Sequence, residues 1–186
     1  MIKKIPNILC ISRMVLVPFI LVFLLENPVS AGLDEKTRFL IAGIIFAVAM
    51  LTDFFDGKIA RKFDAITNFG KFIDPIADKM LVLSMLMAFV DMDIISSVPV
   101  ILILAREFIV TGLRLGAAGK GNVVAANYWG KIKTTLQGVS IGLIFIFGAF
   151  LDIGFTVPRI FMWITAIYTI ISAIPYYISM RQYIKD

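Results

Sequence analysis

Eight residues between positions 53 and 78 have the types and the spacing to act on a phosphate ester. Four of them are aspartates beside strongly apolar stretches of the chain. A charged side chain in or near a bilayer costs roughly 2.5–3.5 kcal/mol, so a group of carboxylates there indicates bound positive charge, most simply divalent cations. The residues follow the spacing D-x2-D-G-x2-A-R-x8-G-x3-D-x3-D and are Asp53, Asp56, Gly57, Ala60, Arg61, Gly70, Asp74 and Asp78.

The aspartates form two pairs that suit a metal site. Asp53 and Asp56 are three residues apart and Asp74 and Asp78 are four apart, so on helices each pair lies on one face. Two adjacent antiparallel helices would then direct all four carboxylates into one cleft. Ligation by oxygen alone favours a hard cation such as Mg²⁺ or Mn²⁺ and argues against zinc. We therefore expect Mg²⁺ or Mn²⁺ at these aspartates.

The residues between the two pairs fit a phosphate ester. Gly57 and Gly70 remove side-chain bulk where a ligand approaches the backbone, and Ala60 leaves a small floor one turn from Asp56. Arg61 can hold a phosphate through its planar fork, which Lys cannot reproduce. Two cations that bridge a diphosphate would neutralise its charge and polarise phosphorus for in-line attack. The alternative is that these are solvated charges at the ends of two amphipathic helices.

The composition indicates a membrane protein. The chain has 186 residues, of which 60% are hydrophobic, and its mean hydropathy is +0.93, outside the usual range of soluble domains. Repeated apolar runs of about 17–25 residues are typical of membrane-spanning helices. We predict an all-α integral membrane protein with a single domain over residues 1–186. The six expected transmembrane helices cover residues 8–25, 37–62, 70–91, 94–115, 129–151 and 156–180.

The distribution of Lys and Arg predicts the orientation. With six spans and an inner N-terminus, the flanks of the outer connections hold only Lys36, Arg38 and Arg159 of the 18 basic residues. The positive-inside rule then puts both termini, and the helix ends that carry the aspartates, on the cytoplasmic side. We expect an inner (plasma) membrane protein whose active site faces the cytoplasm. The net charge of +5 suits anionic lipid headgroups and needs no nucleic-acid partner.

The first apolar stretch resembles a signal peptide, since Lys3 and Lys4 precede it. However, Arg13 interrupts the run and no small-residue cleavage pattern follows, so we expect a retained helix. The chain has one cysteine, Cys10, and no histidine. Acid–base chemistry at neutral pH must therefore use a carboxylate, Lys, Tyr or a metal-bound group.

The eight-residue pattern resembles the signature of the CDP-alcohol phosphotransferases, and every fixed position of that signature is filled. The resemblance implies a homodimeric integral membrane enzyme that displaces CMP from a CDP-linked substrate with an alcohol. It implies that the four aspartates bind two divalent cations, and that Asp78 is also the general base on the acceptor hydroxyl. The residues implied around the cytidine diphosphate are Asp53, Asp56, Gly57, Ala60, Arg61 and Gly70.

Basic residues in the second half of the chain are candidates for binding an anionic acceptor. Arg106 lies inside an apolar helix, Arg114 follows eight residues later, and Lys131 and Lys133 open the next helix. On the cytoplasmic side they could form a pocket for a phosphorylated acceptor. The alternatives are that the lysines extend to the lipid surface and that Arg106 forms a buried pair with Glu107 or a tie between helices. The divergence of adjacent helical residues argues against the pair with Glu107.

Three further stretches resemble one branch of that family, whose members join CDP-diacylglycerol to sn-glycerol 3-phosphate and release CMP. These stretches read I-P-N-I-L-C-I-S-R-M, A-R-E-F-I-V-T-G-L-R and G-K-I-K-T. By this resemblance, Arg106, Arg114 and Lys131 would bind the acceptor phosphate. Cys10 stands where the branch has Thr, a mild departure that leaves the family resemblance intact. The acceptor hydroxyl would lose its proton to Asp78 and attack the β-phosphorus directly, with no covalent intermediate.

Three alternatives stay open. Within the family, inositol phosphate, serine or phosphatidylglycerol as acceptor would use the same aspartates with a different pocket. Membrane prenyltransferases also hold a diphosphate through Asp-rich motifs and Mg²⁺, but they usually need more spans and lack the D-G-x2-A-R core. A cation channel or transporter would carry acidic residues along a transmembrane path, whereas these lie at one interface.

Overall fold

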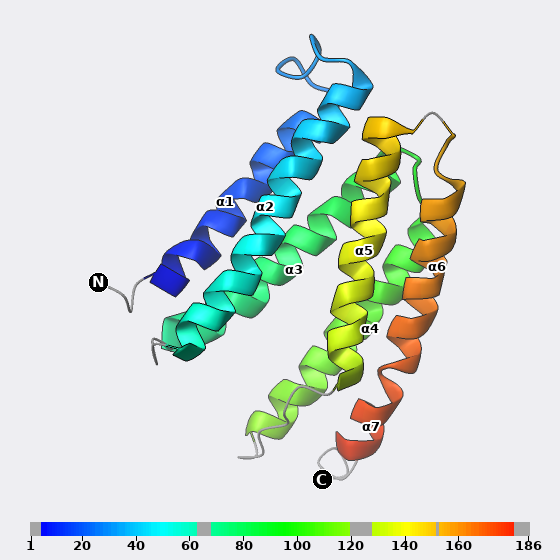
Figure 1. Ribbon diagram of the computed structural model, residues 1–186. Helices are drawn as coiled ribbons and strands as arrows, with labels where there is room; N and C mark the ends of the chain where they lie inside the picture. Colours follow the sequence, from blue (N-terminus) through cyan, green and yellow to red (C-terminus); the bar gives the residue numbers. More distant parts are fainter. Residues whose placement is uncertain (1–4, 63–67, 120–127, 152, 181–186) are drawn as a thin grey trace. The chain divides into compact units, whose positions relative to one another are not determined.

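The protein is all-helical in the part that the structure, a computed structural model, describes, namely residues 5–62, 68–119, 128–151 and 153–180. Those residues contain no strand, which confirms the predicted all-α class. Figure 1 labels the helices, which are α1 (Ile5–Leu24), α2 (Glu35–Lys62), α3 (Asn68–Asp91), α4 (Ser97–Gly119), α5 (Tyr128–Phe150), α6 (Thr156–Ile171) and α7 (Ile174–Met180).

The sixth predicted span, 156–180, is not one regular helix. The structure divides it into α6 and α7, with a turn at Ser172 and Ala173. Pro175 has no amide hydrogen, and its ring crowds the carbonyl four residues earlier, which favours a break at this point. The Ala173 amide donates instead to the Ile170 carbonyl at 3.0 Å, in a tighter three-residue turn.

Two helical stretches within the described residues are long and apolar enough to cross a membrane. They are Tyr128–Phe150 and Thr156–Ile178, each of 23 residues, and the second runs through the break between α6 and α7. Elsewhere, α2 exposes Ile44, Val48 and Leu51 at helical spacing along one side. An apolar stripe of this kind on a helix surface suits contact with lipid. The fold therefore has the features of a membrane protein.

The chain divides into two compact units, which are considered separately below. Unit 1 comprises Met1–Met92 and Ile141–Phe155, and unit 2 comprises Asp93–Ser140 and Thr156–Asp186. The helix α5 contributes its first part to unit 2 and its second part to unit 1.

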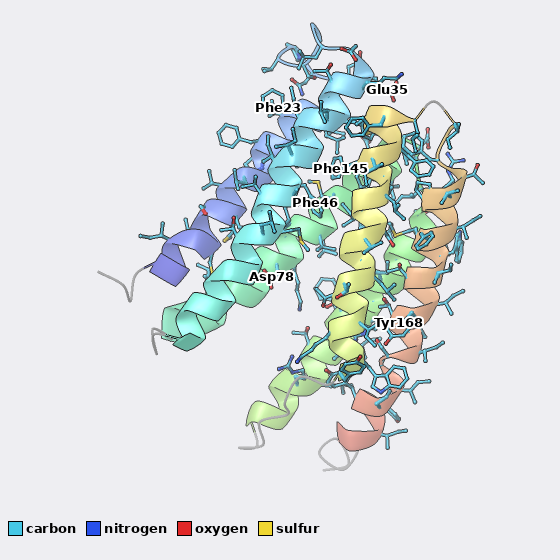
Figure 2. All side chains as sticks on the ribbon, viewed as in Figure 1. Phe23, Glu35, Phe46, Asp78, Phe145 and Tyr168 are labelled. Carbon is cyan, nitrogen blue, oxygen red and sulfur yellow. The ribbon has the colours of Figure 1, made fainter. Side chains whose placement is uncertain are left out.

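An aromatic cluster forms much of the core of unit 1. In this unit α1 packs against both α2 and α3. The ring of Phe145 lies 5.4 Å from that of Phe46 and 5.3 Å from that of Phe89, between ring centroids. Phe39 lies at 6.4 Å from Phe145 in an edge-to-face arrangement. Such geometries stabilise aromatic pairs beyond the effect of their buried area. Figure 2 labels Phe46 and Phe145 on α2 and α5.

Two glycines allow the helices of unit 1 to approach closely. A Cβ atom added at Gly148 on α5 would overlap the ring of Phe39 on α2. One added at Gly43 would lie 3.1 Å from the Cβ of Phe145, which is tighter than ordinary van der Waals contact. The absent side chains are thus part of the packing between α2 and α5.

The start of α2 is set by a capping residue. The Asp34 carboxylate accepts hydrogen bonds from the Thr37 amide at 3.1 Å and from the Thr37 hydroxyl at 2.6 Å. An N-cap aspartate satisfies a helix donor that has no partner within the helix. The hydrogen bonds from Thr37 lower the pKa of Asp34 below its ordinary value of 3.8.

In unit 2, α4 packs against α6 and α7. A buried hydrogen bond of 2.7 Å joins the Ser140 and Thr165 hydroxyls, and the rings of Trp129 and Tyr168 stack at 6.1 Å, so α5 also meets α6. Before α4, Asp93 has a φ of 55°, in the sparsely populated left-handed region. The Arg159 guanidinium donates to the carbonyl oxygens of Asp93 at 3.0 Å and Ile94 at 2.5 Å, and so ties this turn to α6.

Candidate functional site

The eight-residue signature lies at two consecutive helix ends in unit 1. Its first five residues are in the last turns of α2, and the others are in the first half of α3, with five residues between the helices. The helical spacings assumed for the two aspartate pairs therefore hold for the backbone. Apart from their helical backbones, seven signature residues lie outside what the structure describes, so the cleft stays a prediction for Asp53, Asp56, Gly57, Ala60, Arg61, Gly70 and Asp74.

Asp78 is the signature residue whose side chain the structure describes. It lies on α3 and is labelled in Figure 2. Its Oδ1 atom accepts a hydrogen bond from Nη1 of Arg13 on α1, and the two side chains form an ion pair. The Arg13 side chain has no exposed surface, whereas that of Asp78 is 45% exposed. A buried guanidinium needs a compensating charge, and Asp78 provides one.

Sequence reasoning missed this role of Arg13, which served there only to argue against a signal peptide. The available signal was a charged residue inside an apolar helix, which is by default a candidate for a functional site. The identity of its partner was not accessible, because 65 residues separate Arg13 from Asp78 in the chain.

The donor chemistry of the signature fits a hard divalent cation. All four candidate ligands are carboxylates, and the half-exposed Asp78 is accessible to a bound ion. Among the side chains that the structure describes, no three His, Cys, Asp or Glu gather at a metal-binding distance. Asp53, Asp56 and Asp74 are outside that set, so the assembled metal site remains a prediction.

A second polar region lies inside unit 2. Arg106 on α4 and Lys133 on α5 are buried, with relative exposures of 5% and 8%. Lys133 forms an ion pair with Glu107, and Nη1 of Arg106 lies 3.4 Å from the same carboxylate oxygen. Arg106 also donates to the Ser172 hydroxyl at 3.1 Å and lies 5.7 Å over the ring of Tyr176. Two buried cations thus lie beside the same carboxylate.

The contact between Arg106 and Glu107 was one of the alternatives that the sequence left open for Arg106. Its length of 3.4 Å is beyond the usual range of hydrogen bonds, in keeping with the divergence of adjacent helical residues. The closer partner of Glu107 is Lys133, which lies 26 residues further along the chain.

Several buried polar atoms of unit 2 have no hydrogen-bond partner among the described residues. They are Nε of Arg106, Nε2 of Gln137, the hydroxyl oxygen of Tyr168 and Oγ1 of Thr169. Buried polar groups in folded proteins almost always find a partner, so each unsatisfied one indicates a place for water or a ligand. Tyr168 is labelled on α6 in Figure 2. We refer to the four residues that the contacts described above connect, Arg106, Glu107, Lys133 and Ser172, as the unit 2 polar cluster.

The three residues that the sequence nominated for the acceptor phosphate differ in burial. Arg106 is buried, whereas Arg114 and Lys131 are exposed. Lys133 takes the buried position, because residues two apart on a helix face nearly opposite directions. The sequence indicated a basic start to this helix but not which lysine faces inward.

Comparisons with known proteins give a consistent result. The family model for CDP-alcohol phosphatidyltransferase matches residues 3–171. A Bacillus subtilis protein named CDP-diacylglycerol–glycerol-3-phosphate 3-phosphatidyltransferase is 38% identical, with 98% of this chain and 97% of the relative covered. A Rickettsia felis protein of the same name is 37% identical, with 97% of each covered. A Mycobacterium tuberculosis protein named probable phosphatidylglycerophosphate synthase is 43% identical over 76% of this chain and 66% of its own length.

Proposed function

Because this chain belongs to the CDP-alcohol phosphatidyltransferase family, we propose that it transfers a phosphatidyl group from CDP-diacylglycerol to sn-glycerol 3-phosphate and releases CMP. Relatives that align over nearly their whole length carry this reaction in their names. Within the structure, the observation that carries the acceptor is the pair of buried cations, Arg106 and Lys133, around one carboxylate. Two buried cationic side chains suit a phosphorylated acceptor better than serine.

The proposed setting is the inner (plasma) membrane, with six transmembrane segments, both termini in the cytoplasm and the signature at the cytoplasmic interface. The all-helical fold, its two candidate spans and the apolar stripe on α2 support this arrangement. The charge asymmetry of the sequence supports the orientation. The family match, over residues 3–171, supports one functional domain over residues 1–186. A homodimer is proposed from the family alone.

We propose that Asp53, Asp56, Asp74 and Asp78 hold two Mg²⁺ or Mn²⁺ ions. When bound, such cations neutralise the diphosphate and polarise phosphorus for displacement. The all-carboxylate donor set supports this assignment. Arg61 would stabilise negative charge on the departing CMP, and the cytidine diphosphate would lie against Asp53, Asp56, Gly57, Ala60, Arg61 and Gly70.

Asp78 is the proposed general base. It would accept the proton of the primary hydroxyl of glycerol 3-phosphate as that oxygen forms a bond to the β-phosphorus. The bond from the β-phosphorus to the bridging oxygen breaks, and CMP leaves with the electron pair. The 45% exposure of the Asp78 side chain supports a role in which substrate reaches the carboxylate.

The phosphate of the acceptor is proposed to bind Arg106, Arg114 and Lys131, and we add Lys133 to this proposal because it is buried beside Arg106 and Glu107. Burial and an unsatisfied Nε atom support Arg106 as a direct ligand. Arg114 and Lys131 are exposed, so their proposed contribution is to attract the anion from the cytoplasm.

Purified protein in lipid micelles with CDP-diacylglycerol and Mg²⁺ tests the function through CMP release. Glycerol 3-phosphate is compared with inositol, inositol phosphate, serine and phosphatidylglycerol as acceptors. We expect release that depends on glycerol 3-phosphate. Release that depends on another acceptor would keep the reaction class and replace the acceptor. Well-folded protein that gives no release but passes cations across liposomes would favour a transporter.

A further inference from the structure

A fully buried positive charge in unit 1 belongs to a residue outside the signature. Arg13 on α1 has a relative exposure of 0%, and its Nη1 atom contacts Oδ1 of Asp78 on α3. The long side chain of a surface arginine meets many groups by chance, but a buried guanidinium is held by the packing around it. The contact is therefore a product of the fold of unit 1, in which α1 packs against α3.

The surroundings of the Asp78 carboxylate differ between its two sides. One side meets a guanidinium that solvent does not reach, while 45% of the side-chain surface is exposed. Metal binding and proton transfer require a ligand to approach from the exposed side. Both also require the carboxylate to keep one orientation, because small errors in placement reduce rates by about 100-fold. An ion pair with a guanidinium that is itself held by packing restricts the orientations of the short Asp78 side chain.

We propose that Arg13 is a positioning residue for Asp78. The guanidinium holds Oδ1 from α1 and so sets the direction in which the carboxylate meets the metal and the acceptor hydroxyl. This inference rests on the proposed function, since it takes Asp78 as metal ligand and base. Arginine suits the task because its charge is permanent and its donors have a fixed planar geometry. Arg13 acts through Asp78 and does not itself contact the reacting atoms.

Two effects of Arg13 on metal binding oppose each other. Its positive charge repels a divalent cation, whereas a fixed carboxylate binds that cation more tightly. Partners that orient a metal ligand typically change metal affinity or activity by about 10–100-fold when they are removed. The repulsion is weaker because the carboxylate of Asp78 stands next to the guanidinium and water reaches its exposed side. We therefore expect the orienting effect to dominate.

The test replaces Arg13 in the full-length protein and measures Mn²⁺ affinity without substrates, by electron paramagnetic resonance of the free ion. In Arg13→Met we expect Mn²⁺ affinity to fall about 10–100-fold and in Arg13→Lys by less. In CMP release, kcat is expected to fall to a similar extent, while KM for glycerol 3-phosphate changes by less than about threefold. If Arg13→Met does not fold, as judged by circular dichroism and gel filtration, the same measurements on Arg13→Lys decide the test.

A double-mutant cycle separates positioning from a merely structural role. If Arg13 acts through Asp78, adding Arg13→Met to Asp78→Asn leaves Mn²⁺ affinity within about threefold of the single Asp78→Asn variant. If the losses of Mn²⁺ affinity caused by the two single substitutions multiply in the double variant, the proposal is overturned. The matched control is Arg38→Lys, the same substitution at another described arginine of unit 1, on α2. It is expected to keep the Mn²⁺ affinity and turnover of the unaltered protein.

Unchanged or higher Mn²⁺ affinity in folded Arg13→Lys and Arg13→Met would overturn the inference, since the guanidinium would then be a competitor of the metal. The proposed acceptor and the positioning role of Arg13 can be refuted independently. Unaltered protein that releases no CMP with glycerol 3-phosphate, yet loses Mn²⁺ affinity on replacement of Arg13, would refute the proposed acceptor and keep the inference. Normal glycerol 3-phosphate-dependent release in both Arg13 variants would refute the positioning role of Arg13 and keep the proposed acceptor.

Discussion

The two units offer different charged side chains to a ligand. In unit 1, the signature supplies four aspartates, and a buried arginine, Arg13, contacts Asp78. In unit 2, two buried cations, Arg106 and Lys133, lie beside one carboxylate, that of Glu107. In each unit an ion pair thus joins a buried cation to a carboxylate.

This difference indicates what each region requires from outside the protein. Carboxylates such as those of the signature are ligands for hard cations, whereas buried cations such as Arg106 and Lys133 suit an anion. Metal ions and a phosphorylated acceptor have those signs. Nε of Arg106 and Nε2 of Gln137 have no partner among the described residues, so they offer further hydrogen-bond donors in unit 2.

The largest expected effect is at Asp78, where a neutral isostere removes one carboxylate of the signature. Asp78→Asn removes the proposed base and one metal ligand, so kcat for CMP release should fall by about 10²–10⁴-fold or more. Nucleotide binding, measured by isothermal titration with CDP-diacylglycerol micelles, should be reduced much less. Turnover within about tenfold of the unaltered protein would show that another group takes the proton.

The next largest effect is expected at Arg106 in unit 2. Arg106→Met removes a charged hydrogen-bond donor, so kcat/KM for glycerol 3-phosphate should fall roughly 10–100-fold, while KM for CDP-diacylglycerol changes little. Lys131→Met is the exposed comparison. Its smaller effect should shrink as ionic strength rises, because exposed charges are screened by salt. A larger loss in Lys131→Met than in Arg106→Met would place the phosphate at the exposed residues instead.

A smaller effect is expected in the apolar packing of unit 1, which the charge comparison does not involve. Gly148→Ala puts a methyl group into the ring of Phe39, so thermal unfolding in detergent should show a loss of roughly 1–3 kcal/mol. Gly142→Ala is the matched control on α5, because a Cβ there meets no atom within 4 Å. That change should be neutral or slightly stabilising. Equal losses in both variants would contradict the packing role of Gly148.

The smallest effect is the pH dependence of the cap on α2. The pKa of Asp34 is lowered in the folded protein, so its stabilisation is present above the ordinary value of 3.8 and is lost as pH falls through the folded value. Asp34→Ala should therefore lower the melting temperature at pH 6 and make little difference at pH values well below 3.8. A difference that stays constant across this range would mean that the carboxylate charge is not what stabilises the helix start.

Much of the fold was accessible from the sequence because long apolar runs have few alternatives to helices. The exception was the last span, which hydropathy alone treats as continuous. Pro175 carried the signal for the break, but its effect depends on backbone hydrogen bonds that a hydropathy pattern does not represent. The helix positions of the signature followed from its spacing.

The two ion pairs were less accessible. Arg13 was visible as a charge in an apolar helix, but Asp78 as its partner required the packing of α1 on α3. The choice between Lys131 and Lys133 depended on the rotation of α5 about its axis. The first turns of that helix have no clear polar and apolar sides in the sequence, so only the structure distinguishes the two lysines.

The discontinuity of unit 1 has a consequence for biosynthesis. Phe39, Phe46 and Phe89 are made early, but the ring that joins them belongs to Phe145, in the segment Ile141–Phe155. A nascent chain must therefore hold its first three helices without a complete core until α5 has emerged from the ribosome. A chain that stops before residue 141 should fold poorly and be degraded by quality-control proteases, even though it contains the whole aspartate signature.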